Sequence, residues 1–135
     1  MESIEHINYI KSPKDKVYQT LTTEQGLGEI WTRRLKVKPE VGFVNEFDFD
    51  EGYITKFKIL ELKEHSKIIW ECTASDEQWL GTKVSFELTE KDNATTIRLK
   101  HYDWEERTEY YGWCNYNWAM FLYRLKGYCE SQTNV

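Results

Sequence analysis

The stretch from Tyr110 to Ser131 constrains the fold of this chain more than any other part of the sequence. Plotted at about 100° per residue, most of its apolar side chains fall on one continuous arc of a helix. This arc consists of Tyr110, Cys114, Trp118, Phe121, Leu122, Leu125, Tyr128 and Cys129, and the opposite side carries Asn115, Ala119, Lys126 and Glu130. At about 1.5 Å per residue such a helix is roughly 30 to 35 Å long. It must therefore cover a wide apolar surface that the rest of the chain supplies.

Residues 35 to 101 supply that surface, because their apolar side chains recur at every second position. The alternating runs are Phe43, Phe47 and Phe49; Tyr53, Phe57 and Ile59; Ile68, Trp70 and Cys72; Val84, Phe86 and Leu88; and Ile97, Leu99 and His101. A period of two with short turns between the runs predicts an antiparallel meander. One face of the sheet is aromatic and the other is charged, which predicts that only one face is covered. The terminal helix is the natural cover.

The first thirty residues predict a strand followed by two short helices. Residues 3 to 10 alternate and are rich in β-branched and aromatic side chains, as in a strand. Ser12 before Pro13 is typical of an N-cap followed by proline in the first turn of a helix. A second helical piece, residues 24 to 31, contains two glycines, and we expect it to be short or irregular.

The start of the long helix has two candidate caps. Asp103 with Glu106 has capping-box spacing, and Thr108 is an alternative N-cap about one turn later. Glu105, Glu106 and Glu109 lie where the positive end of the helix dipole favours carboxylates. The sequence leaves the first residue of the helix open by one turn.

Length and charge indicate one domain and exclude several classes of partner. The 135 residues fit a single domain, 1–135, with one core. Eighteen Lys and Arg are scattered among 23 Asp and Glu, giving a net charge of −5, so the basic patch of a nucleic-acid-binding protein is absent. The chain has neither a signal-peptide pattern nor an apolar run of about 18 residues. We expect a cytoplasmic protein without a membrane span.

The sequence contains no recognisable metal, cofactor or nucleophile motif. Cys72, Cys114 and Cys129 have no C-x-x-C spacing, and we expect three buried free thiols. His6 and His65 share no metal-ligand spacing with them. There is no EF-hand loop, no G-x-S-x-G and no Gly-rich phosphate loop. We therefore expect no metal and no cofactor, and no residue is assigned a catalytic role.

Seven segments that together span nearly the whole chain carry a family resemblance. They are SPKDKVYQTLTT, GLGEIWT, KPEVGFVNEFDF, KFKILELKEHSKIIWECTAS, WLGTKVSFELTE, TTIRLKHYDW and NWAMFLYRLKGY. In this order they resemble the activator of Hsp90 ATPase homologue (AHSA-like) family of the START-related helix-grip (SRPBCC) superfamily. The resemblance implies an α+β helix-grip fold, in which a curved antiparallel β-sheet wraps around a long C-terminal helix and two short helices follow the first strand. It also implies a cavity for an apolar molecule between helix and sheet.

Side chains that point at the helix–sheet interface are the candidates for lining such a cavity. Strand parity and helical phase select Phe49, Phe57, Trp70, Phe86, Leu99, His101, Cys114, Trp118 and Phe121. Trp31 is a further candidate that closes one end, and Asn117 and Arg124 are the polar groups placed to orient a ligand's head group. The alternative is that all of these rings simply fill the core. For His101 we favour a hydrogen-bonded structural histidine over a catalytic or ligand-binding one.

Three functions from different classes follow from this pattern. The favoured one is a non-enzymatic module that binds a hydrophobic or amphipathic small molecule, or part of a client protein, between helix and sheet. The second is an enzyme acting on a hydrophobic substrate, which requires convergent polar groups such as His101 with Tyr110 or Asn117. The third is a chaperone-binding (Hsp90-type), stress-related or homodimeric interaction domain, which an exposed apolar patch that includes Trp79 or Trp104 would favour.

Overall fold

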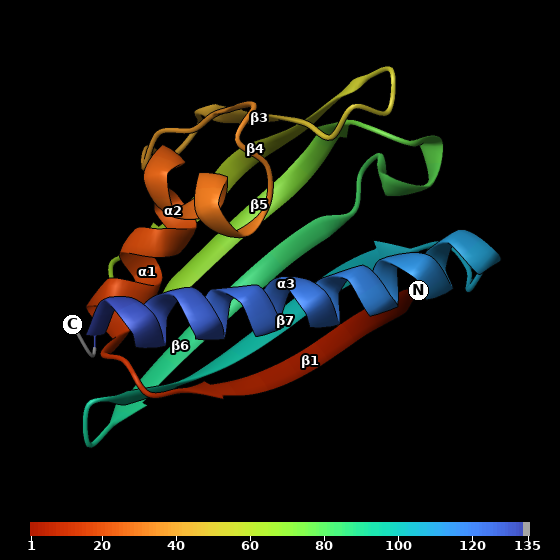
Figure 1. Ribbon diagram of the computed structural model, residues 1–135. Coiled ribbons are helices and arrows are strands. Elements are labelled where there is room, and N and C mark those ends of the chain that lie inside the picture. The colour runs from red at the N-terminus through yellow and green to blue at the C-terminus, as the bar shows by residue number, and fades with distance from the viewer. Residues whose placement is uncertain (134–135) are drawn as a thin grey trace.

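The computed structural model describes residues 1–133 as one antiparallel sheet with helices on one of its faces (Figure 1). Along the chain the elements are β1 (Glu2–Ile10), α1 (Lys14–Thr22), α2 (Glu24–Ile30), β2 (Leu35–Lys36), β3 (Val44–Asp48), β4 (Ile54–Lys63), β5 (Lys67–Ala74), the 3-10 helix η1 (Glu77–Trp79), β6 (Lys83–Lys91), β7 (Ala94–Trp104) and α3 (Glu109–Thr133). The strands lie in the order β1-β7-β6-β5-β4-β3-β2. This arrangement confirms the predicted α+β helix-grip fold with its meander and its long terminal helix.

The hairpin between β6 and β7 shows how local sequence sets the strand register. Asp92 and Asn93 have φ angles of 54° and 61°, so both central residues of the turn are left-handed. Asp and Asn tolerate this conformation, and a two-residue turn of this kind matches the twist of the flanking strands. The pair Lys91 and Ala94 closes the turn, and the register runs from there to Lys83 and Tyr102. The alternating residues of both strands therefore point to the same face.

The aromatic face of the sheet is the inner one, and α3 lies across it (Figure 1). The buried side chains of α3 are Tyr111, Cys114, Trp118, Phe121, Leu122, Leu125 and Cys129. The inward residues of the sheet include Phe47, Phe57, Trp70, Phe86 and Leu99, each at most 1% exposed. At roughly 1.5–3 kcal/mol for each large apolar side chain removed from water, this layer supplies most of the favourable free energy of folding.

α3 begins at Glu109 and is capped by Thr108. The Thr108 hydroxyl accepts a hydrogen bond from the backbone N–H of Tyr111 at 3.2 Å. Of the two caps that the sequence left open, Thr108 is therefore right and the capping box at Asp103 is wrong. Asp103 belongs to β7, where it adopts a φ of 70° and pairs with Lys83 at 2.9 Å. The strand runs to Trp104, three residues beyond the last residue of the predicted run.

The two short helices differ from expectation at their starts and in their regularity. Pro13, and not Ser12, occupies the N-cap position of α1, and no side-chain hydrogen bond caps this helix. α2 is regular despite its glycines, and Thr23 caps it by accepting from the N–H of Gly26 at 3.2 Å. A Cβ at Gly26 would lie 2.2 Å from the carbonyl oxygen of Thr20. Glycine is required there because α1 and α2 approach too closely for any side chain.

Hydrogen bonds with α3 protect the free edge of β1, which lies beside the helix in Figure 1. The bonds run from Tyr111 Oη to Ser3 O (2.7 Å), from Asn8 Nδ2 to Leu122 O (3.3 Å), from Lys126 Nζ to Tyr9 O (2.6 Å) and from Lys11 N to Glu130 Oε2 (2.8 Å). Lys126 and Glu130, predicted on the side of α3 away from the core, therefore point at β1. An exposed strand edge is a site for unwanted strand pairing, and these bonds protect it.

All three cysteines are buried free thiols, as predicted. Burial raises the pKa of the Cys72 thiol to about 12 and that of Cys114 to about 11. Both side chains are therefore protonated at neutral pH and act as small apolar groups. Within residues 1–133, no helix is long and apolar enough to cross a membrane.

Candidate functional site

A pocket of about 310 Å³ opens between the first half of α3, the residue after α2 and the turn that joins β3 to β4. Its walls come from elements far apart in the sequence, as the fold brings the β3–β4 hairpin opposite α3. The lining residues are Trp31, Phe49, Glu51, Tyr53, Thr55, Ser75, Trp79, Tyr110, Cys114, Asn117, Trp118 and Arg124. The space is far larger than one or two water molecules.

Trp31 forms the apolar floor of the pocket. It follows directly after the last residue of α2, where the backbone leaves the helical conformation at φ −128° and ψ −82°. Its ring lies 4.9 Å from the ring of Phe49 and 5.4 Å from that of Trp118, measured between centroids. Below it, Phe47 and Phe121 contact the same ring at 4.7 and 5.1 Å. The floor is therefore rigid, because Trp31 is held by aromatic contacts with both the sheet and α3.

One rim of the pocket is polar and already internally hydrogen-bonded. The Tyr53 hydroxyl donates to the Glu51 carboxylate at 2.7 Å, and burial together with that carboxylate raises the pKa of Tyr53 to about 12. The hydroxyls of Thr55 and Ser75 lie 2.9 Å apart and share a hydrogen bond. These groups come from the turn after β3, the start of β4 and the end of β5. Each of these four groups therefore already has one hydrogen-bond partner on this side.

The opposite rim belongs to α3 and carries polar groups without partners. Asn117 and Arg124 are seven residues apart, so two helical turns place them on the same side of α3. Neither side chain makes a hydrogen bond or an ion pair with any residue of the 1–133 region. Arg124 can therefore offer its planar set of N–H donors to an acceptor in the pocket.

Cys114 and Trp79 form the wall between the pocket and the core. The indole N–H of Trp79 donates to the sulfur of Cys114 at 3.2 Å. Because burial raises the pKa of Cys114 to about 11, the thiol is not a nucleophile at neutral pH despite its place beside the pocket. Trp79 is only 9% exposed, since η1 folds it inward beneath α3.

His101 is a structural histidine at the centre of a buried hydrogen-bond chain. The indole N–H of Trp118 donates to His101 Nδ1 at 2.9 Å, which places the ring proton on Nε2. Nε2 then donates to the Thr82 hydroxyl at 2.8 Å, and this hydroxyl donates to the carbonyl oxygen of Trp79 at 2.6 Å. Burial lowers the pKa of His101 to about 3, so the ring is neutral. Both ring nitrogens are occupied, and neither faces the pocket.

The structure separates the predicted site residues into two groups. Trp31, Phe49, Cys114, Asn117 and Trp118 line the pocket, as does Arg124. The remaining six lie beneath it in the closed part of the core; they are Phe57, Trp70, Phe86, Leu99, His101 and Phe121. The polar pairing of His101 with Tyr110 or Asn117 does not form, because His101 bonds to Thr82 and Trp118 instead.

Sequence reasoning missed the polar rim opposite α3. Glu51, Tyr53, Thr55 and Ser75 lie in or next to hairpin turns, where strand parity does not say which way a side chain points. The signal that could have found them is the turn at Gly52, whose φ of 86° folds the β3–β4 hairpin back toward the inner face. Trp79 and Trp104 are buried, at 9% and 1% exposed, so neither contributes to the exposed patch that would have favoured an interaction domain.

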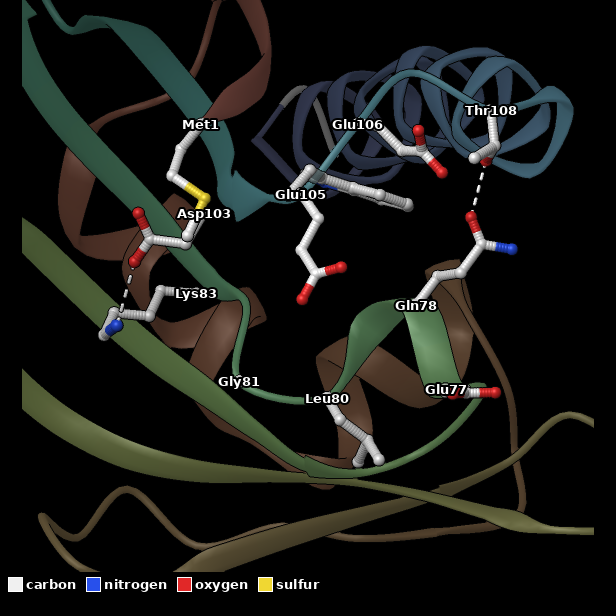
Figure 2. A pocket seen from close by; sticks show the side chains of 11 residues that line it. Met1, Glu77, Gln78, Leu80, Gly81, Lys83, Asp103, Glu105, Glu106 and Thr108 are labelled. Atoms are coloured by element: carbon white, nitrogen blue, oxygen red, sulfur yellow. Dashed lines mark hydrogen bonds and ion pairs between the residues drawn. The ribbon is translucent and has the colours of Figure 1, made fainter.

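A second hollow, of about 660 Å³, lies beside the start of α3 (Figure 2). Figure 2 shows Glu77, Glu105 and Glu106 pointing around its mouth, with the Lys83–Asp103 ion pair at one side and the Thr108–Gln78 hydrogen bond at the other. Lys83 and Asp103 pair with each other, and no ion pair within residues 1–133 involves Glu77, Glu105 or Glu106. Among residues 1–133, no cluster of three or more His, Cys, Asp and Glu side chains could hold a metal ion. This hollow brings no reactive groups together.

Comparison with known proteins agrees with this architecture. A family model described as activator of Hsp90 ATPase homolog 1-like protein matches residues 11–130. The solution structure of the Aha1 dimer from Colwellia psychrerythraea is 36% identical, with a TM-score of 0.88 over 96% of this chain and 97% of that chain. No functionally curated protein matches significantly.

Two more distant structures share the fold alone. Protein MLL2253 from Mesorhizobium loti is 21% identical, with a TM-score of 0.82 over 93% of this chain and 95% of that chain. Protein BH1534 from Bacillus halodurans is 19% identical, with a TM-score of 0.79 over 96% and 98%. At this level of identity the likeness extends to the arrangement of helices and strands, and the side chains of the pocket have to be interpreted from this chain itself.

Proposed function

The chain belongs to the activator of Hsp90 ATPase homolog 1-like family, and on that premise we propose that it is a non-enzymatic module that binds an amphipathic small molecule. The single observation that carries this proposal is the pocket of about 310 Å³ with an aromatic floor and an unpaired polar rim. Small-molecule sites are mostly apolar concave spaces of about 300–1,000 Å³ with a few polar groups that orient the ligand. This pocket lies at the small end of that range.

The two sides of the pocket define the chemistry of the ligand. The rings of Trp31, Phe49 and Trp118 favour a flat or short apolar body. Asn117 and Arg124 favour an acceptor or anionic head group, such as a carboxylate or sulfonate, because a guanidinium binds these groups with two parallel hydrogen bonds. The Glu51 carboxylate is held by Tyr53 on the far rim, where it disfavours an anionic head group. The head group should therefore lie on the α3 side.

A second, enzymatic function has less support in this geometry. General acid–base or nucleophilic chemistry needs titratable groups that converge on one point in the pocket. Here the imidazole is sequestered in the core and the nearest thiol is protonated, since burial lowers the pKa of His101 to about 3 and raises that of Cys114 to about 11. The arrangement favours binding. We also infer a reducing compartment such as the cytoplasm, because the three cysteines are free.

The test uses 8-anilinonaphthalene-1-sulfonate, a fluorescent probe with an aromatic body and an anionic head group. Titration of the purified protein should give saturable binding with one site per chain. Replacing Arg124 by Ala should weaken binding about 10-fold, as expected for a charged hydrogen bond worth about 1.5 kcal/mol or more. Asn117→Phe should abolish binding by filling the pocket mouth. The matched control is Lys58→Ala, which removes an exposed cation from the outer side of β4.

The proposal fails if the probe binds to the wild type and to Asn117→Phe with equal affinity, because binding would then take place elsewhere. It also fails if the wild type shows no saturable binding to this probe or to a short-chain carboxylate such as decanoate. Native mass spectrometry of the freshly purified chain provides an independent readout, since an amphipathic ligand from the expression host would add a discrete mass.

A second candidate function is self-association. The relative from Colwellia psychrerythraea is described as a dimer, and we propose that this chain also forms a homodimer. The observation that favours it is the exposure of three large aromatic side chains on α3, Trp113 at 62%, Tyr116 at 60% and Tyr123 at 70%. Sedimentation velocity over a concentration series tests it, and a single monomeric species at all concentrations would contradict it.

A further inference from the structure

α3 is apolar on two opposite sides, and only one of them is covered. The uncovered side consists of Trp113, Tyr116, Met120, Tyr123 and Gly127, which we call the outer stripe. Successive members of the outer stripe are separated by three or four residues. This is the spacing of a helix seam that packs along another helix. A surface helix normally presents polar side chains to water on this side, and a helix that is apolar all round is normally buried.

No contact within the described chain accounts for the outer stripe. The core side of α3 is covered by the sheet, one flank borders the pocket through Asn117 and Arg124, and the other flank bonds to β1. At 100° per residue, the outer stripe lies opposite Trp118, the centre of the buried side. Aromatic rings that are exposed together on one side of a helix lower the solubility of a protein. Such a patch indicates a surface that binds a partner.

We propose that the outer stripe is the interface of the homodimer, with α3 packed antiparallel to α3 of a second copy and the two-fold axis at Met120. This inference rests on the self-association proposed above and specifies where it takes place. In an antiparallel pair centred at residue 120, a residue of one copy faces the residue of the other copy whose number makes the sum of the two numbers 240. Trp113 then faces Gly127 of the second copy, and Tyr116 faces Arg124.

The shapes of these facing residues are complementary. A Cβ placed on Gly127 has no atom within 4 Å, so this position is an open notch in the outer surface of α3. The indole of Trp113, 62% exposed, is the largest projection on the same surface. The antiparallel arrangement inserts each projection into a notch. A parallel arrangement sets Trp113 against itself and Gly127 against itself, which leaves a clash at one end and a void at the other.

Charge also favours a second copy as the occupant. The chain has a net charge of −5, yet no acidic residue occurs between Tyr110 and Cys129. Two acidic proteins can therefore approach through this side without carboxylates facing each other. The two Arg124 side chains stand on positions about 12 Å apart along the pair, which exceeds the Debye length of roughly 8 Å at physiological salt.

The other surfaces through which two copies could pair are less suited to a dimer. Sheet continuation through β1 is disfavoured because Tyr111 and Lys126 bond to backbone carbonyl oxygens of that edge. The opposite edge strand, β2, has only two residues. The outward side of the sheet carries charged residues such as Lys83, Glu87 and Lys100. Its exposed large apolar side chains are divided between β1 and β4, which are separated by three strands, and they are Ile7, Tyr9, Ile54 and Leu60.

The size of the outer stripe predicts a weak dimer. At roughly 150–250 Å² for each large aromatic side chain, the exposed parts of its three rings amount to roughly 400 Å² on each copy. Two copies then bury roughly 800 Å² from the rings alone, and the neighbouring Met120, Asn117 and Arg124 add to it. Stable interfaces begin near about 1,200 Å² in total. We expect a dissociation constant in the micromolar range.

Sedimentation velocity of the full chain from about 1 to 500 μM gives the first test, with two disrupting variants. Tyr123→Glu puts a charge on the outer stripe, and Gly127→Leu fills the notch that receives Trp113. Each should raise the dissociation constant at least 10-fold. Both positions are exposed, so circular dichroism should show an unchanged fold. The matched control is Ile7→Glu, which makes the same kind of change at a 58% exposed position on β1 and should leave the dimer intact.

Cysteine cross-linking in air then tests the antiparallel arrangement, since the native thiols are buried. Met120→Cys should form an intermolecular disulfide, because position 120 faces itself. Gly127→Cys should not, because the two copies of position 127 are about 21 Å apart in an antiparallel pair. Efficient cross-linking through position 127 would overturn the antiparallel assignment.

The two proposals fail in different ways. A wild type that remains monomeric at 500 μM refutes self-association itself. A wild-type dimer that Tyr123→Glu and Gly127→Leu leave unchanged refutes only the assignment to the outer stripe. Binding of a purified Hsp90-type chaperone to the monomer, lost in Tyr123→Glu, would show that the occupant is a different protein and would overturn the second copy as partner.

Discussion

Replacing Trp118 by Phe tests whether the buried hydrogen-bond chain through His101 stabilises the fold. The substitution keeps an aromatic ring at the centre of α3 but removes the indole N–H that donates to His101 Nδ1 at 2.9 Å. His101 is completely buried, and its Nε2 is already bonded to Thr82. The Nδ1 atom then has no donor and no access to bulk water.

The structure allows the cost of this substitution to be worked out. A buried acceptor without a donor costs about 1–3 kcal/mol. The smaller ring also leaves a cavity of roughly 40 Å³, which costs about 1 kcal/mol at about 24 cal/mol per Å³. We therefore expect Trp118→Phe to lower the free energy of unfolding by about 2–4 kcal/mol. For a chain of this length, about 1 kcal/mol corresponds to roughly 3.5 °C in Tm, so Tm should fall by roughly 7–14 °C.

Urea denaturation followed by circular dichroism measures this change, with Trp113→Phe as the control. Trp113 lies on the same helix but is 62% exposed, so its replacement should change the free energy of unfolding by less than about 0.5 kcal/mol. If Trp118→Phe is as mild as the control, the indole–imidazole bond does not stabilise the fold. A large loss of stability would assign Trp118 to the core, and lost probe binding at unchanged stability would assign it to the pocket alone.

Three further predictions follow from other buried groups. Burial lowers the pKa of His101 to about 3, below its unfolded value of about 6.5, so the stability that neutral His101 contributes is complete above pH 6.5 and is lost as the pH falls toward 3. The free energy of unfolding, measured with urea, should therefore drop by about 2 kcal/mol between pH 7 and pH 5. His101→Gln should remove this pH dependence. Gly26→Ala should destabilise the fold by about 2–4 kcal/mol because the new Cβ meets the backbone of α1. Gly112→Ala, whose Cβ has open space around it, should stabilise the fold by about 0.5–1 kcal/mol. Thermal denaturation compares the two variants. The Cys114 thiol, whose pKa burial raises to about 11, should react with a disulfide reagent at pH 8 only after urea unfolds the chain, and fast reaction of the folded protein would contradict its burial.

Local pattern was sufficient to predict most of the fold. A period of two from Phe43 to His101 can be satisfied only by strands, and the predicted turns between those strands fall where the structure has them. The arc on the terminal helix predicted six of its seven buried residues, and the seventh, Tyr111, lies two turns before Trp118 on the same side of the helix. Periodicity is a property of the sequence itself, so the buried side of an element can be predicted without knowing which elements pack against it.

Helix caps were less predictable because they depend on where neighbouring strands end. Asp103 and Thr108 both fitted an N-cap in sequence, and the choice was made by β7, which extends to Trp104 and takes Asp103 into an ion pair. Ser12 likewise fitted a cap, but the chain turns there between β1 and α1, and Pro13 occupies the cap position. Tertiary contacts compete for the same polar groups.

The pocket shows the limit of parity arguments most clearly. Strand parity correctly predicts that Phe57 and Phe86 point inward, and packing also turns Phe49 and Trp31 inward. Parity does not distinguish the end of the helix–sheet interface that is open from the end that is filled by side chains. The open end is set by how far the β3–β4 hairpin stands from α3, and Trp31 holds that distance by contacting both. Glu51 and Tyr53 enter the pocket only because of this spacing.

The sequence by itself determined the order of the elements, the aromatic face of the sheet and the helix that covers it, because burial of apolar surface follows directly from residue spacing. Only the tertiary structure decided that the helix from Tyr110 to Ser131 has four distinct sides, one in the core, one bordering the pocket, one bonded to β1 and one exposed as the outer stripe. It alone also decided that His101 is sealed by Trp118 and Thr82 while Arg124 stays unpaired. These outcomes depend on distances between elements remote in sequence, which no local pattern contains.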